Sequence, residues 1–336
     1  MSKRVTITDL ARELGLAKSA VSYALNDQPG VSAQTRARVK ALARRRGWHP
    51  SVVARALAGG RSAAIGVVLR RDPALLGEEP WYPLVLAGME QVLLEADVTL
   101  MLRMVGDRDD MARRTYRQWA EERRVDGVVL FDGDTDDARL PLLRELDLPY
   151  VLVGFSHGDD PAVLGDSVAE AATIGQALVD CGLTKVLFIG GLVELAAEKR
   201  RRAGLTQYAV AHGLDVQILD GDYTTQSGRA LVQQVLASGS IPQAVVCSND
   251  LMAVGALAGL RASGIDVPGQ TSLIAWDDSI VSRTALPPLT ALNRDPMAFG
   301  RSAARLLLAI TQGSPTSTRI VQPARLIVRD SLRQVS

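Results

Sequence analysis

The sequence has few aromatic residues, few cysteines and histidines, and no long apolar run. Aromatic residues make up 4% of the 336 residues, and the chain contains two cysteines and three histidines. We expect Cys181 and Cys247 to be reduced and buried, because two cysteines do not make a disulfide scaffold in a chain of this size. His49, His157 and His212 are not at the spacing of metal ligands. No apolar stretch is long enough to span a bilayer.

Motifs that identify enzymes and cofactor sites are also lacking. Gly190-Gly191 follows an apolar run but lacks the rest of a phosphate-binding loop, and no Gly-x-Ser-x-Gly motif occurs. Asp277 and Asp278 are adjacent, and adjacent side chains of an extended chain point to opposite sides. We therefore expect no catalytic residues, no metal ion and no cofactor. The segment after Met1 is polar, unlike a signal sequence, so we expect a cytoplasmic protein.

The net charge of +1 hides two parts of opposite sign. Residues 1–61 contain twelve Lys and Arg against three Asp and Glu, a net charge of +9. The remaining 26 basic and 34 acidic residues give residues 62–336 a net charge of −8. A basic head on an acidic body is the electrostatic footprint of a module that binds phosphates, as in nucleic acid.

Residues 5–26 predict two short amphipathic helices separated at Gly15. Apolar residues recur there at helical spacing: Leu10, Ala11 and Leu14, then Ala20, Val21, Ala24 and Leu25. Thr6 and Asp9 resemble a capping box at the start of the first helix. Two helices joined by a tight turn predict a helix-turn-helix, whose second helix lies in the DNA major groove. Its outward polar residues are then expected to contact DNA: Lys18, Ser19, Ser22 and Tyr23.

A third helix is predicted over residues 31–47, with Ser32 as its N-cap and Gly47 as its C-cap. Its apolar residues are expected to face the first two helices: Val31, Val39 and Leu42. The alternative for the two helices at residues 5–26 is a small helical hairpin within an ordinary core. A short helical segment at 49–60 opens near a proline and ends in glycines, and it is too short to be stable alone in water.

The rest of the chain alternates strand-like and helix-like segments. Six apolar runs are predicted as strands: 64–69, 127–131, 150–153, 186–190, 244–247 and 272–276. Amphipathic segments between them are predicted as helices: 84–95, 113–123, 168–181, 201–212 and 227–238. Continuous apolar strands separated by helices are typical of parallel sheets covered on both faces, and the length favours two α/β lobes. The chain is expected to pass between lobes near 162–166 and 287–293.

Residues 5–61 resemble the DNA-binding headpiece of the LacI/GalR family of bacterial transcription regulators. The matching residues come in order: Thr6-Ile7, Asp9-Leu10-Ala11, Val21-Ser22, Leu25-Asn26, Pro29-Gly30-Val31-Ser32, Thr35-Arg36, Val39, Gly47, Pro50, Ala54-Arg55, Leu57 and Gly66. The resemblance implies an all-α helix-turn-helix headpiece on an α/β body of two parallel-sheet lobes, similar to type I periplasmic binding proteins. The expected boundaries are a headpiece at 1–48, a hinge at 49–61 and a body at 62–336, with lobes at 62–161 plus 292–322 and at 162–291 plus 323–336.

The resemblance also implies how the headpiece contacts DNA. Paired hinge helices from two subunits fold on the operator, and Leu57 wedges into the minor groove, where apolar wedges kink the duplex. The alternative is a linker with an incidental leucine. The implied DNA-binding residues are Thr6, Lys18, Ser19, Ser22, Tyr23, Asn26, Ser32, Thr35, Ser51, Ala54 and Leu57.

Arg201, Asn249 and Asp277 are the centre of the predicted effector cleft. Arg201 occupies the arginine position of the family's Arg-x-x-Gly segment, while Asn249 and Asp277 each follow a strand, where ligands bind in open α/β sheets. Such donors and acceptors suit the hydroxyl groups of a sugar. The alternatives are a helix N-cap for Asn249, a loop residue for Asp277 and a solvated charge for Arg201. Further residues near strand ends complete the predicted site: Arg70, Trp81, Tyr82, Phe155, Asp166, Tyr223 and Trp276.

Three residues depart from the family pattern. Ala17 replaces the usual serine, so the second helix lacks a side-chain cap. Tyr23 stands where arginine is frequent and cannot make the bidentate contact to guanine, so Lys18 is the better candidate for that base. Gly154 stands where several sugar-binding members have aspartate, which leaves nucleosides and small acids open as effectors.

Two hypotheses from different classes follow. The first is a ligand-responsive transcription regulator, a repressor that binds a pseudo-palindromic operator as a homodimer and whose DNA and effector affinities are reciprocally coupled. The second is a cytoplasmic solute-binding protein or cleft enzyme with a non-functional helical head. The basic headpiece and Leu57 favour the first, because the alternatives need neither.

Overall fold

The computed structural model describes residues 5–25, 28–48, 61–106, 108–134, 136–314, 319–321 and 324–334. The chain divides into two compact units, Met1–Ser62 and Ala63–Ser336. Four of the residues predicted to contact DNA lie outside the described residues: Asn26, Ser51, Ala54 and Leu57. None of the helices that the structure describes is long and apolar enough to cross a membrane.

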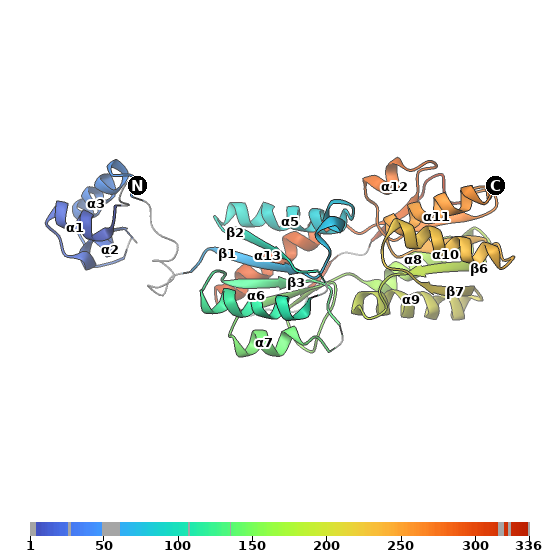
Figure 1. Ribbon diagram of the computed structural model, residues 1–336, viewed down its shortest axis with the longest axis horizontal. Coiled ribbons are helices and arrows are strands. Elements are labelled where there is room, and N and C mark those ends of the chain that lie inside the picture. Colours follow the sequence, from blue (N-terminus) through green and yellow to red (C-terminus); the bar gives the residue numbers. More distant parts are fainter. Residues whose placement is uncertain are drawn as a thin grey trace. The chain divides into compact units, whose positions relative to one another are not determined.

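The described residues of the first unit form three helices (Figure 1): α1 (Ile7–Leu14), α2 (Lys18–Leu25) and α3 (Ala33–Arg45). The predicted capping box is confirmed, since the Asp9 amide donates to Thr6 Oγ1 at 3.3 Å and the Thr6 amide donates to Asp9 Oδ2 at 3.0 Å. The predicted N-cap of α3 is also confirmed, because Ser32 Oγ accepts from the Thr35 amide. Arg46 caps the other end of α3, and Gly47 follows it with a left-handed φ of 62°.

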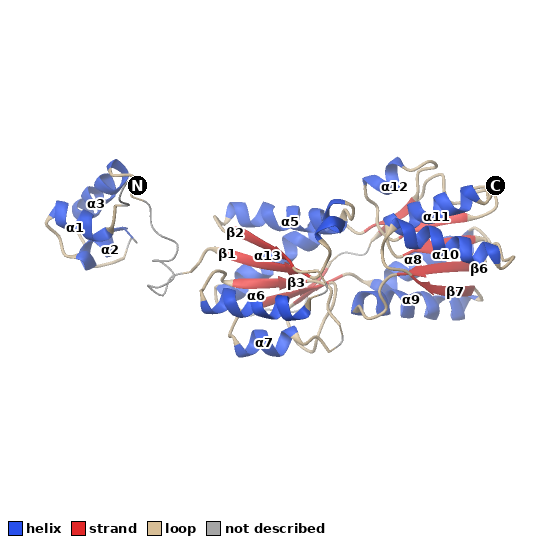
Figure 2. Ribbon diagram, in the orientation of Figure 1, coloured by secondary structure: helices blue, strands red, loops and turns tan. Residues whose placement is uncertain are grey.

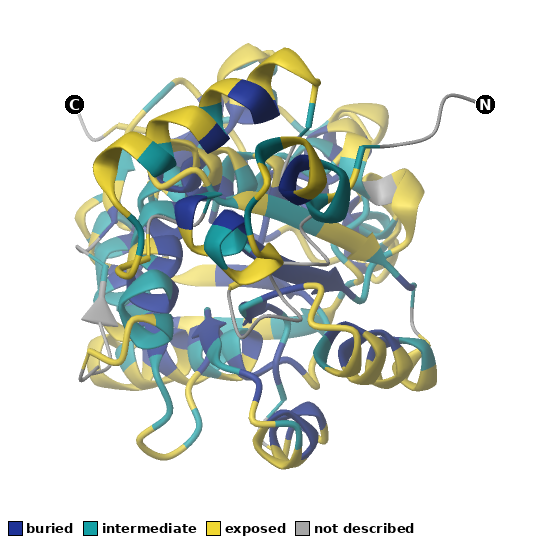
Figure 3. Ribbon diagram, turned by 90° about the vertical axis from the view of Figure 1, so that its left-hand side faces the viewer, coloured by how far each residue is buried: buried dark blue, intermediate teal, exposed yellow. Residues whose placement is uncertain are grey.

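A small apolar core holds the three helices together. Its buried residues come from all three: Leu10, Ala11, Val21, Ala24, Val39, Leu42 and Ala43. The inner helix faces are buried and the outer faces exposed (Figure 3), as the apolar spacing predicts. α1 and α2 with the turn at Gly15, where φ is 64°, form the predicted helix-turn-helix.

The second unit consists of two lobes, each with one six-stranded sheet between helices (Figure 2). The N-lobe strands are β1 (Ala64–Leu69), β2 (Thr99–Met104), β3 (Gly127–Leu130), β4 (Tyr150–Val153), β5 (Ala162–Leu164) and β11 (Arg319–Ile320). Their order is β11-β5-β4-β3-β1-β2, and every pair is parallel. One face packs against α5 (Trp81–Glu95) and α13 (Pro296–Thr311), the other against α6 (Asp109–Glu121) and α7 (Arg139–Glu145). A 3₁₀ turn at Pro73–Gly77 precedes α5.

The C-lobe repeats this arrangement. Its strands are β6 (Lys185–Gly190), β7 (Asp215–Asp220), β8 (Ala244–Cys247), β9 (Ser272–Ala275), β10 (Thr290–Asn293) and β12 (Arg325–Ile327). Their order is β12-β10-β9-β8-β6-β7, and only β12 is antiparallel to its neighbour among the described strands. One face packs against α8 (Ser167–Asp180) and α9 (Ala196–His212), the other against α10 (Thr225–Ala237) and α11 (Asp250–Ala262). The short α12 (Ile280–Thr284) follows β9.

All six predicted apolar runs form strands, and β1, β3, β8 and β9 are buried along their whole length. The predicted lobe boundaries need a correction. β5 pairs with β4 in the N-lobe sheet, so the first passage between lobes follows Leu164 and not residue 161. β10 pairs with β9 in the C-lobe sheet, so the second passage follows Asn293 and not residue 291.

Candidate functional site

A cleft in the second unit contains about 620 Å³ of empty space between the two lobes. Its wall combines charged, polar and aromatic residues from both lobes: Arg71, Glu79, Trp81, Tyr82, Phe131, Asp132, Gly133, Val153, Gly154, Phe155, Leu195, Ala197, Arg201, Tyr223, Ser248, Asn249, Asp277 and Arg294. Most follow the carboxyl ends of strands, the usual position of a ligand in open α/β sheets.

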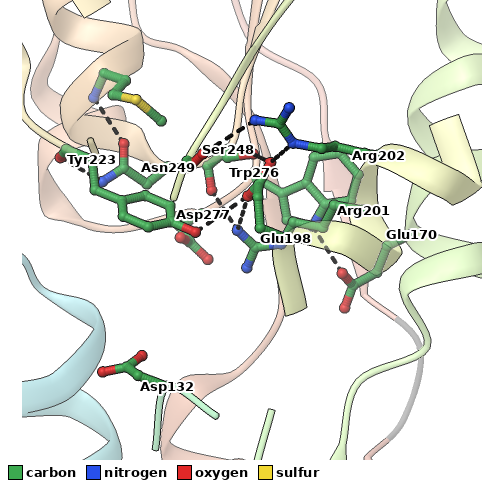
Figure 4. Close-up of polar contacts among 12 residues, drawn as sticks. Asp132, Glu170, Glu198, Arg201, Arg202, Tyr223, Ser248, Asn249, Trp276 and Asp277 are labelled. Atoms are coloured by element: carbon green, nitrogen blue, oxygen red, sulfur yellow. Dashed lines mark hydrogen bonds and ion pairs between the residues drawn. The ribbon is translucent and has the colours of Figure 1, made fainter. Parts of the chain in front are cut away.

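On the C-lobe side, the fully buried carboxylate of Glu198 organises the polar groups (Figure 4). It accepts hydrogen bonds from Ser248 Oγ at 3.1 Å, from the Tyr223 hydroxyl at 3.2 Å and from Arg202 Nε at 3.2 Å. Arg201 lies 3.9 Å from the same carboxylate. Because one buried carboxylate accepts from three side chains, these contacts hold the surrounding side chains in fixed positions.

Arg201 is held from two further directions. Its Nη1 donates to the Ser248 carbonyl at 2.8 Å, and its guanidinium lies 5.4 Å from the centre of the Trp276 ring. Trp276 is itself fully buried and donates from Nε1 to Glu170 at 2.8 Å. The guanidinium therefore reaches the cleft in one preorganised orientation, which suits a fork of donors for a ligand.

Asn249 and Asp277 lie at the ends of neighbouring strands β8 and β9. Asn249 caps α11, with Oδ1 accepting from the Met252 amide, and its Nδ2 donates to the Tyr223 carbonyl at 2.9 Å. Asp277 accepts from Arg294 Nη1 at 3.1 Å. Asn249 is therefore the N-cap of a helix, the alternative considered from the sequence. It also lines the cleft.

On the N-lobe side, Arg71, Tyr82 and Asp132 form one hydrogen-bonded group. Arg71 Nε donates to the Tyr82 hydroxyl at 3.1 Å, and that hydroxyl donates to Asp132 Oδ1 at 2.6 Å. Burial is the largest single influence and lowers the pKa of Arg71, but Asp132 together with Tyr82, Glu79 and Tyr223 raises the pKa above its usual value. Arg71 also lies 5.5 Å from the Tyr223 ring of the other lobe.

Aromatic rings form apolar walls of the cleft. Trp81 is held between Arg294, whose guanidinium lies 4.3 Å from the ring centre, and Phe299, at 5.2 Å in an edge-to-face contact. Phe155 and Tyr223 line other parts of the same cavity. Fixed rings of this kind suit the apolar faces of a sugar or a base.

Glu79 is the least constrained polar group of the cleft. No hydrogen bond or ion pair involves its carboxyl within the described residues. Burial raises the pKa of Glu79 to about 7, and the positive charge of Arg71 opposes this while Asp132, Asp277 and Asp250 reinforce it. Asp250 behaves alike: burial and the nearby Asp277 raise its pKa to about 7.

The start of α9 connects the two lobes beside the cleft. The Ala196 amide donates to the Gly133 carbonyl at 3.0 Å, and Lys199 Nζ lies 3.1 Å from Asp134 Oδ1. Arg200 donates to the carbonyl of Gly154, which has a left-handed φ of 80°. Arg201, which lines the cleft, follows directly in the chain, so ligand contacts and interlobe contacts arise from successive residues.

Seven of the ten predicted effector residues lie on the wall of the cleft: Trp81, Tyr82, Phe155, Arg201, Tyr223, Asn249 and Asp277. The structure places three elsewhere. Arg70 pairs with Asp109 at 2.6 Å outside the cleft, because adjacent residues at the end of β1 diverge and it is Arg71 that enters. Asp166 caps α8 by accepting from the Ala169 amide. Trp276 is buried behind Arg201.

Four charged residues of the cleft were not predicted: Arg71, Glu79, Asp132 and Arg294. Two of them carried a usable signal. Asp132 and Arg71 each follow a strand, β3 and β1, after one intervening residue, so the strand-end rule applied to both. Glu79 precedes α5 and Arg294 lies at a passage between lobes, positions that depend on the folded loops.

The residues predicted to contact DNA lie on the first unit as follows. Lys18, Ser19 and Tyr23 are exposed on α2, and Ser22 is half-buried. Thr6, Ser32 and Thr35 take part in the helix caps of α1 and α3, which positions their hydroxyl groups near helix starts. Within the described ranges, no group of three or more His, Cys, Asp and Glu side chains is placed to hold a metal ion.

Two family models match separate parts of the chain. Residues 6–51 match the model of bacterial regulatory proteins of the lacI family, and residues 175–332 match a periplasmic binding protein-like domain. These two matches agree with the helix-turn-helix of the first unit and the C-lobe of the second.

Curated relatives and solved structures cover almost the whole chain. The regulator AglR of Rhizobium meliloti is 31% identical over 97% of this chain and 94% of its own. The regulator CelR of Thermobifida fusca is 29% identical over 98% of both chains, and a CelR–cellobiose structure gives a TM-score of 0.75 at 28% identity, with 98% of this chain and 100% of the other covered. The lac repressor dimer on its operator has the same fold, with a TM-score of 0.85 at 24% identity over 98% and 99% of the chains. These matches do not favour a transport protein or an enzyme. The chain belongs to the LacI family of bacterial transcription regulators.

Proposed function

We propose that this regulator is a repressor in the bacterial cytoplasm that binds a pseudo-palindromic operator as a homodimer and responds to a carbohydrate. The effector binds in the cleft without being chemically changed. The charge balance of the cleft is the observation that carries the ligand class. Three arginines, Arg71, Arg201 and Arg294, face three carboxylates, Glu79, Asp132 and Asp277, so a neutral ligand rich in hydroxyl groups fits best.

The aromatic walls and a relative's complex support the same ligand class. Trp81, Phe155 and Tyr223 offer flat apolar surfaces between the polar groups, as carbohydrate sites do. CelR, of the same family, forms a complex with cellobiose.

The surface of the first unit supports operator binding. The exposed Lys18 and Ser19 begin α2, and the N-terminal residues of a recognition helix are those that contact base edges. Two headpieces on two half-sites require a dimer. Exposed apolar side chains on both lobes suit such an association: Leu94, Leu102, Ile280 and Leu286.

Fluorescence anisotropy with cognate and scrambled duplexes tests the DNA-binding role. Lys18→Ala should weaken the cognate site by about 1–3 kcal/mol and relax the preference at one base pair. Arg44→Ala, which removes an exposed charge on α3, is the matched control and should change both duplexes alike. Equal losses on both duplexes for Lys18→Ala would remove this residue from base reading.

Calorimetric titration with carbohydrates tests the effector. Asp277→Asn should abolish carbohydrate binding and leave operator affinity largely unchanged, because the residue lies on the wall of the cleft. A variant that fails to fold, or one that still binds the same carbohydrate as tightly, contradicts the assignment.

A further inference from the structure

One buried carboxylate outside the cleft lies against two of the passages between the lobes. Glu170 is in the first turn of α8, and its side chain is 3% exposed. Arg294, the first residue of the second passage, donates from Nε to Glu170 Oε1 at 3.2 Å. Gly165, the first residue of the first passage, packs so close to the same oxygen that a Cβ on it would lie 2.8 Å away. The Glu170 carboxylate therefore joins two chain segments that are far apart in the sequence.

The same carboxylate supports two arginines of the cleft wall. Trp276 Nε1 donates to the second oxygen, Oε2, at 2.8 Å, and the Trp276 ring centre lies 5.4 Å from the Arg201 guanidinium (Figure 4). Arg294, held at Nε, uses Nη1 to donate to Asp277 at 3.1 Å. Both arginines line the cleft, whereas Glu170 does not. One buried acid thus contacts, directly or through one ring, two of the arginines of the cleft wall.

The Glu170 carboxylate stays ionised in this buried position. Burial is the largest single influence and raises the pKa of Glu170, but Arg294, Arg201 and the Trp276 N–H together lower this pKa below its ordinary value. Removing one member of a buried ionic group leaves the others without compensation. Networks of this kind hold their members in one arrangement, so the donors of Arg201 and Arg294 have fixed directions.

We propose that Glu170 is a positioning residue for the effector, because its carboxylate fixes Arg294 directly and Arg201 through Trp276. The inference rests on the proposed effector cleft. The effector does not touch Glu170, yet its affinity depends on this carboxylate, since misdirected arginines lose hydrogen bonds to the ligand. A shift of the first passage at Gly165 reaches both arginines by the same route.

Calorimetric titration of the full chain with glucose, cellobiose, maltose and lactose tests this role. Glu170→Ala should weaken the tightest-binding sugar at least about ten-fold, the effect of one lost hydrogen bond to a charged group. Glu170→Gln keeps one acceptor oxygen without the charge and should fall between wild type and Glu170→Ala. Trp276→Phe keeps a ring beside Arg201 but lacks the N–H, and it should lose less affinity than Glu170→Ala because Arg294 keeps its partner.

Two further variants separate position from stability. Gly165→Ala should weaken binding of the same sugar, because its methyl group must displace the Glu170 carboxylate. Leu178→Ala is the matched control, because Leu178 is fully buried in the C-lobe core about two turns further along α8. It should lower the melting temperature yet change sugar affinity less than about two-fold. Thermal unfolding verifies that each variant is folded at the titration temperature.

The tryptophans give a readout that needs no ligand. In NMR spectra of the indole N–H groups, Glu170→Gln should shift the signals of Trp276, its direct partner, and of Trp81, whose ring centre lies 4.3 Å from the Arg294 guanidinium. The signal of Trp119, which packs on the other face of the N-lobe sheet, should stay in place.

The outcomes separate the positioning role from the carbohydrate function. Sugar affinity in Glu170→Ala that is unchanged, or reduced no more than in Leu178→Ala, overturns the positioning role and leaves carbohydrate binding intact. Absence of binding across the sugar series in wild type overturns the carbohydrate function, and the indole signals then decide the positioning role. An unmoved Trp81 signal in Glu170→Gln shows that Arg294 keeps its position without this carboxylate, and it overturns the proposal. If Glu170→Ala does not fold, Glu170→Gln and Gly165→Ala decide by the same criteria.

Discussion

The two lobes share one topology but contribute different chemistry to the cleft. The strand order β2-β1-β3-β4-β5-β11 of the N-lobe corresponds to β7-β6-β8-β9-β10-β12 of the C-lobe. On the C-lobe side, Arg201 belongs to a set of side chains held together by the buried Glu198 carboxylate. On the N-lobe side, the cleft is lined by aromatic rings and by the paired side chains of Arg71 and Asp132. A repeated architecture thus fixes where strand ends lie, and the residues placed there decide which ligand binds.

The two lobes also differ in how closely the two helices on one face of each sheet approach each other. In the N-lobe, α5 and α13 approach so closely that a Cβ on Gly88 would lie 2.1 Å from the Met297 carbonyl oxygen. In the corresponding C-lobe pair, a Cβ on Gly204 of α9 would lie 3.0 Å from the Ala171 Cβ. The N-lobe pair is therefore in direct backbone contact at Gly88, while the C-lobe pair is also close at Gly204, with the Ser167 carbonyl oxygen 3.1 Å from the added Cβ, but overlaps less.

The largest expected effect is on the C-lobe framework. Glu198→Ala leaves Arg201, Tyr223 and Ser248 without their common partner, and removal of one member of a buried ionic group costs about 3–5 kcal/mol. Denaturant unfolding measures the loss. Glu194→Ala, an exposed glutamate four residues earlier, should be nearly neutral. A loss below about 1 kcal/mol for Glu198→Ala would show that the framework does not depend on this carboxylate.

The helix pairs give the second prediction. Gly88→Ala should destabilise the protein by about 3 kcal/mol, because the Met297 backbone cannot move away without shifting α13. Gly204→Ala should cost about 1 kcal/mol or less, since its nearest neighbour needs to yield only slightly. Thermal unfolding of both variants ranks them. The reverse ranking would contradict the assignment of the tighter contact to the N-lobe.

The third prediction concerns pH and involves both lobes. The pKa values of Glu79 and Asp250 are raised to about 7, so the folded state binds protons that the unfolded state has released above about pH 4. The free energy of unfolding should therefore fall as the pH rises from about 5 to 8, with Asp250 contributing on the order of 2 kcal/mol. Urea unfolding at several pH values measures this slope. Asp250→Asn and Glu79→Gln should each flatten it, and unchanged slopes in both variants would refute the cause.

The smallest expected effect is at the interlobe contact of α9. The Lys199 and Asp134 side chains are 48% and 45% exposed, and an ion pair so exposed contributes less than about 0.5 kcal/mol. Lys199→Ala should therefore leave thermal stability almost unchanged. A loss above about 1 kcal/mol would show that the exposed pair, and not the buried main-chain contact of Ala196, holds the lobes together.

The sequence predicts the central strands and the helix-turn-helix but not the edges of the sheets. β1, β8 and β9 are continuous apolar runs, because both faces of a parallel strand are covered. β2 and β7 are edge strands with partly exposed residues, so they lack that signal. The cleft residues follow the same division: Asn249 and Asp277 were predicted from central strand ends, whereas Glu79 and Arg294 come from segments whose position only the folded chain defines.

Gly154 has a consequence for how such a regulator changes its ligand during evolution. Its φ of 80° is a conformation that among other residues is adopted mainly by asparagine and aspartate, and a Cβ there would meet no atom within 4 Å. A single substitution to aspartate would thus place a new carboxylate in the cleft without a steric clash, although its left-handed φ would strain the backbone. Arg200 would keep its partner, because it uses the main-chain carbonyl that every residue possesses. The side chain at residue 154, and with it the preferred ligand, can therefore change during evolution without loss of the hydrogen bond between the lobes.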